Sequence, residues 1–295
     1  MNMLKTPLPI LSKRNTHPRD DRIHFYEEGH RYTIDDDPSK YTSVTTLNHK
    51  HFPEFDANKV IDAIINGKKW NETNPYWGMT PDEIKQQWKN NGLSSSQAGT
   101  AMHLDIECFM NQDLVDEYDN PADYNHEELL EIYNSEPQPE TMVDEWIFFL
   151  KFVKDHPLLK PYRTEWLVYY EELKIAGSID MVYENPDGSL ILYDWKRAKE
   201  IKKTDWYNSS YATTQCISHI PNTNFWHYSL QLNTYKAILE AKYNKKVSGM
   251  YLVKLHPNNS GNTYILIKCA DLSTEINDLF RERRDYVNSS EFSNS

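Results

Sequence analysis

Hydrophobic positions between residues 163 and 198 change from a helical spacing to the strand-like spacing in which apolar and polar side chains alternate. Three runs carry this pattern: RTEWLVYYEE, KIAGSIDMVYE and SLILYDWKRA. The sequence NPDG separates the last two runs and favours a tight turn. The pattern predicts three consecutive antiparallel strands that form a meander.

Segments on both sides of these strands have the spacing and the caps of helices. We expect a helix that begins after Asp56, a short helix capped by Thr80, and a separate helix over residues 99–110. Three further helices are predicted from MVDEWIFFLKFVKDHP, FWHYSLQLNTYKAILEAKYN and LSTEINDLFRERRDYV.

Further β structure is expected near both ends of the chain. RIHFYEEGHRYTID resembles a hairpin that turns at Glu28 and Gly29, and YTSVTTL is rich in β-branched residues. SGMYLVKLHP and NTYILIKCA predict a second hairpin. Strands and helices are thus interspersed, which predicts an α/β (α+β) fold with a central mixed β-sheet flanked by helices.

The length of the chain allows one large domain or two modest ones, and we expect a single domain over residues 22–288. A flexible basic tail (1–21) would precede it and a disordered tail (289–295) would follow it. The expected parts of the domain are an N-terminal β/helical part (22–98), a helix (99–110), an acidic insertion or loop (111–140), a core (141–270) and a C-terminal helix (271–288).

Charge is distributed unevenly in this acidic protein. The net charge is −12 over 295 residues, which by itself argues against a nucleic-acid binder. However, residues 196–203 read KRAKEIKK, whereas residues 105–145 contain many acids and no Lys or Arg. The distribution permits a local basic channel, although the basic run taken alone is typical of a solvated helix start.

The sequence favours an intracellular location (cytoplasm, nucleoid or viral factory) over secretion. The N-terminal segment lacks the apolar core of a secretory signal, although the absence of acids before Asp20 leaves organelle targeting open. No apolar run is long enough to span a membrane, so we expect no membrane partner. Cys108, Cys216 and Cys269 are too scattered for a disulfide framework or a CxxC metal knuckle.

Two of the predicted strands carry charged residues among apolar ones. Asp194 and Lys196 are two residues apart and should project from the same face of their strand, with Trp195 on the other face. A hairpin that turns at NPDG would bring Asp180 beside them. Two close carboxylates favour a divalent cation, and all-oxygen ligation suits Mg²⁺ or Mn²⁺. The alternative is a weak ion pair on an exposed strand.

Four motifs occur in the order of a known family. GSID followed by a strand that ends in DWK resembles the PD-(D/E)xK nuclease superfamily in its DxK variant. GTAMHLDIE, QLNTY and YTSVTTL resemble the G-T-x-x-H, Q-x-x-x-Y and S-V-T segments of the RecB-like exonuclease branch, such as mitochondrial genome maintenance exonucleases and their viral and bacterial relatives. The resemblance spans residues 40–240 and implies a restriction-endonuclease-like core.

The resemblance implies roles for individual residues. Asp180 and Asp194 would ligate the catalytic metal together with the backbone carbonyl of Trp195, and Lys196 would activate or position the attacking water. His103 would complete the metal shell or contact the scissile region, the alternative being a partly buried histidine with a structural partner.

Two further acids have less certain roles. Glu165 lies on the strand before GSID, where relatives often hold an acid near the metal, and its alternative is a solvated strand residue. Glu107 shares a helix face with His103, and pairing with a Lys or Arg on that face is as good an explanation as a site role.

Nucleic-acid contacts are expected from two regions. Gln231 and Tyr235 lie four residues apart on one helix face and would reach a phosphate or a base edge. Further candidate phosphate contacts are Thr100, Arg197, Lys199 and Lys202. Three aromatic residues near the basic run would either stack bases or belong to the core: Trp206, Tyr207 and Tyr211.

These observations predict a Mg²⁺- or Mn²⁺-dependent DNA exonuclease that acts on single-stranded ends in replication, repair or recombination. The alternatives are an endonuclease and a non-catalytic DNA-binding or assembly subunit with the same fold. Three isolated cysteines predict no iron–sulfur cluster. Because the chain has no helicase motif, unwinding would come from a partner.

Overall fold

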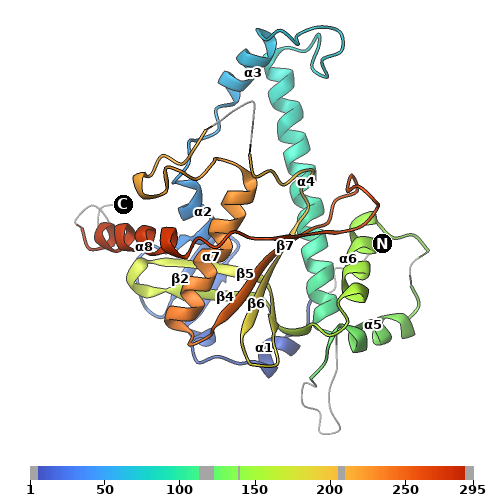
Figure 1. The fold of residues 1–295 in the computed structure, drawn as a ribbon, viewed down its shortest axis with the longest axis vertical. Helices are drawn as coiled ribbons and strands as arrows, with labels where there is room; N and C mark the ends of the chain where they lie inside the picture. Colours follow the sequence, from blue (N-terminus) through green and yellow to red (C-terminus); the bar gives the residue numbers. More distant parts are fainter. Residues whose placement is uncertain (1–5, 113–122, 139, 205–209, 290–295) are drawn as a thin grey trace.

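A computed structural model describes residues 6–112, 123–138, 140–204 and 210–289. A six-stranded mixed β-sheet lies at the centre of the fold, and helices flank it (Figure 1). The predicted fold class is therefore confirmed. None of the described helices combines the length and the apolarity that a membrane crossing requires.

The predicted meander forms the middle of the sheet. Strands β4 (Lys160–Tyr170), β5 (Ile175–Glu184) and β6 (Leu190–Lys196) pair antiparallel in chain order. Gly188, in the turn between β5 and β6, has a φ of +77°, a conformation that glycine adopts without strain. The turn predicted at NPDG is thereby confirmed.

Three more strands complete the sheet. β7 (Val247–Lys254) pairs parallel to β6, and β8 (Ile265–Lys268) pairs antiparallel to β7, as the second predicted hairpin requires. β3 (Thr42–Ser43) pairs parallel to β5. A separate hairpin, β1 (Ile23–Tyr26) and β2 (Arg31–Ile34), also matches its prediction.

Each face of the sheet packs against its own hydrophobic cluster. Leu190 and Leu192 of β6 lie in the first cluster, whereas Tyr193 and Trp195 lie in the second. The first cluster takes its helical residues mainly from α2 (Val44–His49), α7 (Asn224–Lys242) and α8 (Ser273–Val287). The second takes them from α1 (Ile10–Arg14), α4 (Pro81–Met110), α5 (His126–Ser135) and α6 (Asp144–Asp155).

Helix α4 is one continuous helix of 30 residues, not the two helices that were predicted. Thr80 caps it through a complete capping box, as expected for its first turn. Gly92 and Gly99 lie within the helix, and a Cβ atom at either position would meet nothing within 4 Å. The far end of α4 projects from the sheet together with α3 (Ala57–Ile65), which Asp56 caps as predicted (Figure 1).

Two other segments differ from their predictions. YTSVTTL forms only the two-residue strand β3, because the Ser43 side chain accepts the Thr46 N–H and starts α2. The expected flexible tail contains α1, whose Leu11 is fully buried and donates its N–H to Asn111. Leu11 is buried against α4, and this contact holds the segment in place. The two prolines and the basic charge of the segment do not predict such a contact.

The remaining short elements are three 3₁₀ turns. They are η1 (Asp20–Arg22), η2 (Glu171–Leu173) and η3 (Gln215–Ile217). The expected acidic insertion or loop at 111–140 contains α5, and its residues 113–122 lie outside the described part. The tail predicted at 289–295 also lies outside it, except for Ser289.

Candidate active site

The central strand β5 has a gap in its pairing, and Asp180 lies at this gap. β4 pairs along one edge of β5, while the other edge is shared by β3, at Ile175 and Ala176, and by β6, from Met181 onwards. On that edge, residues 177–180 therefore lie between the segment that pairs with β3 and the segment that pairs with β6. The Asp180 carboxylate bridges the gap to β6 by accepting the Trp195 N–H at 3.2 Å.

Glu165 lies opposite Asp180, because Thr164 pairs with Met181 and Trp166 pairs with Ile179. Its φ of +42° is uncommon for a residue other than glycine and marks local backbone strain. The Ser178 hydroxyl donates a 2.7 Å hydrogen bond to its carboxylate. The predicted acid near the site is thus held in a fixed position beside Asp180.

Helix α4 places His103 between these two carboxylates. Met102, Ile106 and Phe109 on the same helix are buried in the second cluster, which fixes the direction of the imidazole. The Nδ1 atom of His103 lies 3.5 Å from Asp180 and 3.8 Å from Glu165. The Nε2 atom lies 2.9 Å from the backbone carbonyl of Trp195.

Asp194 and Lys196 form an ion pair beside this group. The Lys196 ammonium lies 2.6 Å from the Asp194 carboxylate, which is almost fully buried, and 4.6 Å from the centre of the Tyr228 ring on α7. Trp195 packs in the second cluster, on the other face of β6. The alternation predicted for these three residues is confirmed.

The two faces of β5 exchange near Asp180. Ile175 and Ile179 belong to the first cluster, whereas Met181 and Tyr183, which strict alternation would put on the same face, belong to the second. The irregularity coincides with the positive φ of Glu165 on the neighbouring strand. A regular strand pattern does not predict which way the Asp180 side chain points.

Burial and unbalanced charge shift the pKa values of the group. Burial and the charge of Asp194 raise the pKa of Asp180 to about 7. Burial lowers the pKa of His103, but the carboxylates of Asp180 and Glu165 outweigh it and bring the pKa to about 9. The site thus contains more negative charge than its surroundings neutralise, with the imidazole as the nearest counter-ion.

The arrangement fits a divalent cation. His103, Glu165 and Asp180 each offer a ligand atom, and these atoms lie within 4.8 Å of one another. Two carboxylate oxygens with one imidazole nitrogen are suitable ligands for Mg²⁺ or Mn²⁺. Asp194 is not part of this group, because its carboxylate faces Lys196.

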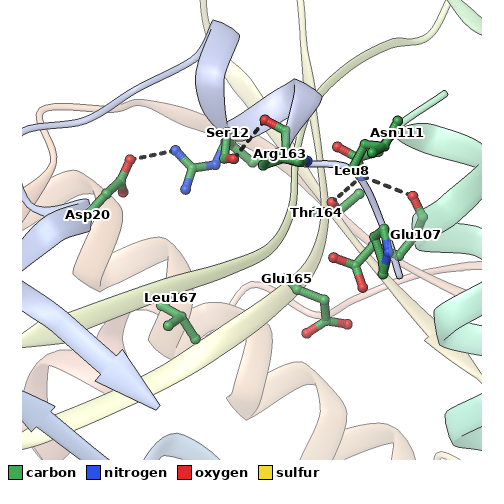
Figure 2. Close-up of a pocket in the computed structure, with 11 residues that line it drawn as sticks. Leu8, Ser12, Asp20, Glu107, Asn111, Arg163, Thr164, Glu165 and Leu167 are labelled. Atoms are coloured by element: carbon green, nitrogen blue, oxygen red, sulfur yellow. Dashed lines mark hydrogen bonds and ion pairs between the residues drawn. The ribbon is translucent and has the colours of Figure 1, made fainter. Parts of the chain in front are cut away.

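A cleft of about 290 Å³ adjoins Glu165 (Figure 2). Glu107, one helical turn after His103, lines it together with Glu165, Leu8 and Ser12. Burial and the charge of Glu165 raise the pKa of Glu107 to about 7. Glu107 therefore faces the cleft, and no cation pairs with it among the described residues.

Gln231 and Tyr235 lie on the sheet-facing side of α7. Tyr235 is only 3% exposed, and its ring packs against Gly177, where a Cβ atom would come within 2.8 Å of it. Gln231, one turn earlier, is half-buried and lies on the same side of the helix as Tyr235. The buried ring supports β5 beside the gap, and it offers no open face for a base.

The other candidate nucleic-acid contacts differ in their exposure and in their partners. Thr100 and Lys199 are exposed, and Lys202 is exposed and pairs with Glu200. Arg197 is half-buried and pairs with Glu145 of α6 at 2.7 Å. Tyr211 is half exposed, while Trp206 and Tyr207 lie outside the described residues.

Tyr228 is a site residue that the sequence analysis missed. It lies one turn before Gln231 on α7, and its ring contacts the Lys196 ammonium. The sequence offers one signal for Tyr228: it precedes Gln231 by three residues, which puts both side chains on the same face of the helix.

A comparison with protein-family models identifies one match. The model described as the PD-(D/E)XK nuclease superfamily matches residues 80–291, a range that includes His103, Glu165, Asp180, Asp194 and Lys196. No curated protein matches the chain significantly. The family match covers well over half of the chain and agrees with the mixed sheet and its flanking helices. The chain therefore belongs to the PD-(D/E)XK nuclease superfamily.

Proposed function

We propose that the protein is a divalent-metal-dependent deoxyribonuclease that degrades DNA from single-stranded ends. Family membership supports the general part of this proposal: the superfamily consists of nucleases that bind DNA and usually use Mg²⁺ or Mn²⁺. The observation that carries the metal-dependent part is the convergence of His103, Glu165 and Asp180 within 4.8 Å.

Metal binding is assigned to the residues around the gap in β5. Asp180, Glu165 and His103 are the proposed ligands, together with the backbone carbonyl of Trp195, which contacts His103. Asp194 stays a proposed ligand because it is close enough to Asp180 for its charge to raise the pKa of that carboxyl group, in addition to the effect of burial. The bound ion would polarise the phosphoryl oxygen and lower the pKa of the attacking water.

Lys196 is proposed to orient the attacking water and to stabilise the charge that develops on the phosphoryl group. Its ammonium is held between the Asp194 carboxylate and the Tyr228 ring, so it occupies one fixed position next to the ligand group. A fixed ammonium donates hydrogen bonds without reorganisation during the reaction.

The exonuclease mode rests on the resemblance of GTAMHLDIE and QLNTY to the RecB-like branch. We propose an intracellular role in DNA replication, repair or recombination, with a helicase as the partner that supplies unwound strands. Thr100, Lys199, Lys202 and Arg197 are proposed to contact phosphates, the last after exchange of its Glu145 partner.

Cleavage assays test this proposal directly. End-labelled linear single strands, linear duplexes and circular single strands are incubated with Mg²⁺, Mn²⁺ or EDTA. We expect metal-dependent cleavage of linear but not circular single strands. Cleavage of circles would instead identify an endonuclease, and binding without cleavage would identify a non-catalytic subunit.

Variants connect the activity to the site. Lys196→Met should abolish cleavage while folding and DNA binding persist, because its proposed role is in the transition state. Lys246→Met is the matched control, since Lys246 is exposed beyond the end of α7 and contacts none of the site residues. Equal activity of Lys196→Met and the wild type would show that the site is wrongly placed.

A further inference from the structure

Helices α7 and α8 pack against each other (Figure 1), and residues of both line a second concave surface. This surface shares no lining residue with the cleft beside Glu165. It is a groove of about 400 Å³, and Tyr170, at the end of β4, lies at its margin. Tyr170 is five residues from Glu165 along β4, a Cα separation of about 17 Å in an extended strand.

The walls of the groove are fixed at both ends. Asn233 of α7, which is buried, accepts the Leu272 N–H and donates to the carbonyl of Ala270, which ties the start of α8 to α7. Near its other end, buried Arg283 of α8 donates to the carbonyl of Leu173. The groove is therefore preformed and does not depend on a bound partner for its shape.

The groove is locally positive in a protein of net charge −12. Lys236, Arg281 and Arg284 line it, and Glu240 is its one acidic lining residue among those described. The Glu240 carboxylate accepts the Val247 N–H, which directs it toward β7. The hydrogen-bond partners of Lys236 and Arg284 are the neutral hydroxyls of Ser273 and Tyr170. Arg281 pairs with Asp278 and Lys236 acts on the nearby Asp271, so the positive charge of the groove is balanced only in part.

Small and aliphatic side chains form the floor. Ala237, Ala241 and Ile276 line the groove between the cations. Phe280 is buried, and it meets the Tyr170 ring edge-on, while Lys242 covers a face of that ring. Little aromatic surface is therefore open to a nucleic-acid base, because Phe280 is buried and Lys242 covers one face of the Tyr170 ring, whereas the floor accepts an apolar side chain.

We propose that the α7–α8 groove binds an acidic peptide segment of a partner protein, with an apolar side chain on the floor and carboxylates against Lys236, Arg281 and Arg284. The lining cations outnumber the one lining acid and so complement an acidic segment, and the small aromatic surface favours a peptide over a nucleic-acid strand. This inference is independent of the proposed nuclease reaction. The groove would recruit this protein to the partner that carries the acidic segment.

Fluorescence anisotropy tests the proposal. The probes are a fluorescein-labelled peptide with four acids around a Leu-Phe pair, the same peptide with lysines in place of the acids, and a labelled single-stranded oligonucleotide. We expect the acidic peptide to bind and the basic peptide not to bind. Lys236→Glu combined with Arg284→Glu should weaken binding of the acidic peptide by about tenfold or more.

Two further variants separate binding from folding. Arg281 is 70% exposed and pairs only with Asp278 of its own helix among the described contacts, so Arg281→Glu leaves the fold intact and should weaken binding. Ala241→Trp fills the groove from an exposed position and should have the same effect. Lys89→Glu, exposed on α4 outside the groove, is the matched control and should bind like the wild type.

Several outcomes would overturn the proposal. They are absence of binding by the wild type, equal binding by the wild type and the groove variants, and equal binding of the acidic and basic peptides. Loss of oligonucleotide binding in the groove variants, without any peptide binding by the wild type, would assign the groove to nucleic acid instead.

Discussion

Glu165 lies directly across from Asp180 in the β4–β5 pair, and both carboxylates face the imidazole of His103. Opposed carboxylates on neighbouring strands repel each other, and the raised pKa of Asp180 indicates that the protonated His103 offsets only part of the cost of charging this group. The protein therefore keeps an unfavourable pair of charges at the point where β5 lacks a strand partner on one edge. This relationship leads to the first prediction.

Divalent metal should stabilise the folded protein. Mg²⁺ or Mn²⁺ at one hundred times its dissociation constant should add about 2.7 kcal/mol to the free energy of unfolding. Asp180→Asn removes one of the opposed charges, so it should raise the melting temperature without metal and abolish the increase with metal. Differential scanning fluorimetry measures both effects.

The matched control is Asp82→Asn, because the side chain of Asp82 is 95% exposed at the start of α4. This variant should respond to metal as the wild type does. A metal-dependent increase that persists in Asp180→Asn would contradict the assignment of Asp180 as a ligand.

Gly177→Ala should destabilise the protein because its Cβ atom would lie 2.8 Å from the Tyr235 ring. Forcing this contact should cost about 1–3 kcal/mol, measured by urea unfolding. Gly92→Ala is the control in an open helical position, where alanine should stabilise by about 0.5–1 kcal/mol. A Gly177→Ala variant as stable as the wild type would show that Tyr235 does not pack against β5.

Tyr228→Leu should reduce cleavage without affecting the fold. The ring holds the Lys196 ammonium through a cation–π contact worth about 0.5–2 kcal/mol, so the single-turnover rate should fall by up to about thirtyfold. Tyr26→Leu removes a similar contact with Arg31 far from the site and should cleave like the wild type. An unchanged rate in Tyr228→Leu would mean that Asp194 alone positions Lys196.

His126 should make the protein sensitive to acid. It is fully buried, its Nε2 lies 2.9 Å from the Tyr183 hydroxyl, and burial lowers its pKa from 6.5 to about 3. Because the unfolded chain binds this proton more readily, the contribution is intact above pH 6.5 and decreases as the pH falls toward 3. Each pH unit in this window should cost about 1.4 kcal/mol.

Urea unfolding at pH 7.5 and pH 5.0 measures this loss. His126→Gln cannot take up the proton and should show a shallower dependence than the wild type. His24→Gln on β1 is the control, because His24 is exposed and should leave the dependence unchanged. Parallel pH profiles for the wild type and His126→Gln would exclude His126 as the cause.

Local sequence patterns were sufficient for the elements that present the site. The alternation of DWK placed Asp194 and Lys196 on one face, and NPDG placed the turn that brings Asp180 near them. The strand alternation and the turn each depend on residues that are close together in the chain. The Thr80 and Asp56 caps were predictable for the same reason.

The ligand group itself depends on contacts that no local pattern encodes. His103 reaches the Trp195 carbonyl from 92 residues away, and Glu165 turns toward it through a positive φ that alternation does not predict. Asp194 faces the Lys196 ammonium and is not among the three residues whose ligand atoms converge, so its role as a metal ligand stays a prediction. Long-range packing of α4 decides which carboxylates meet.

Arg283 connects α8 to parts of the chain that are synthesised much earlier. This residue of α8 donates to Thr42, 241 residues earlier, and to the carbonyl of Leu173, so the last helix secures both β3 and the turn that leads into β5. On the ribosome, His103, Asp180 and Lys196 all emerge before α8 does. A nascent chain thus contains these three residues before α8 can hold β3 and the turn that leads into β5, so the candidate site is completed only after α8 has been synthesised and has docked.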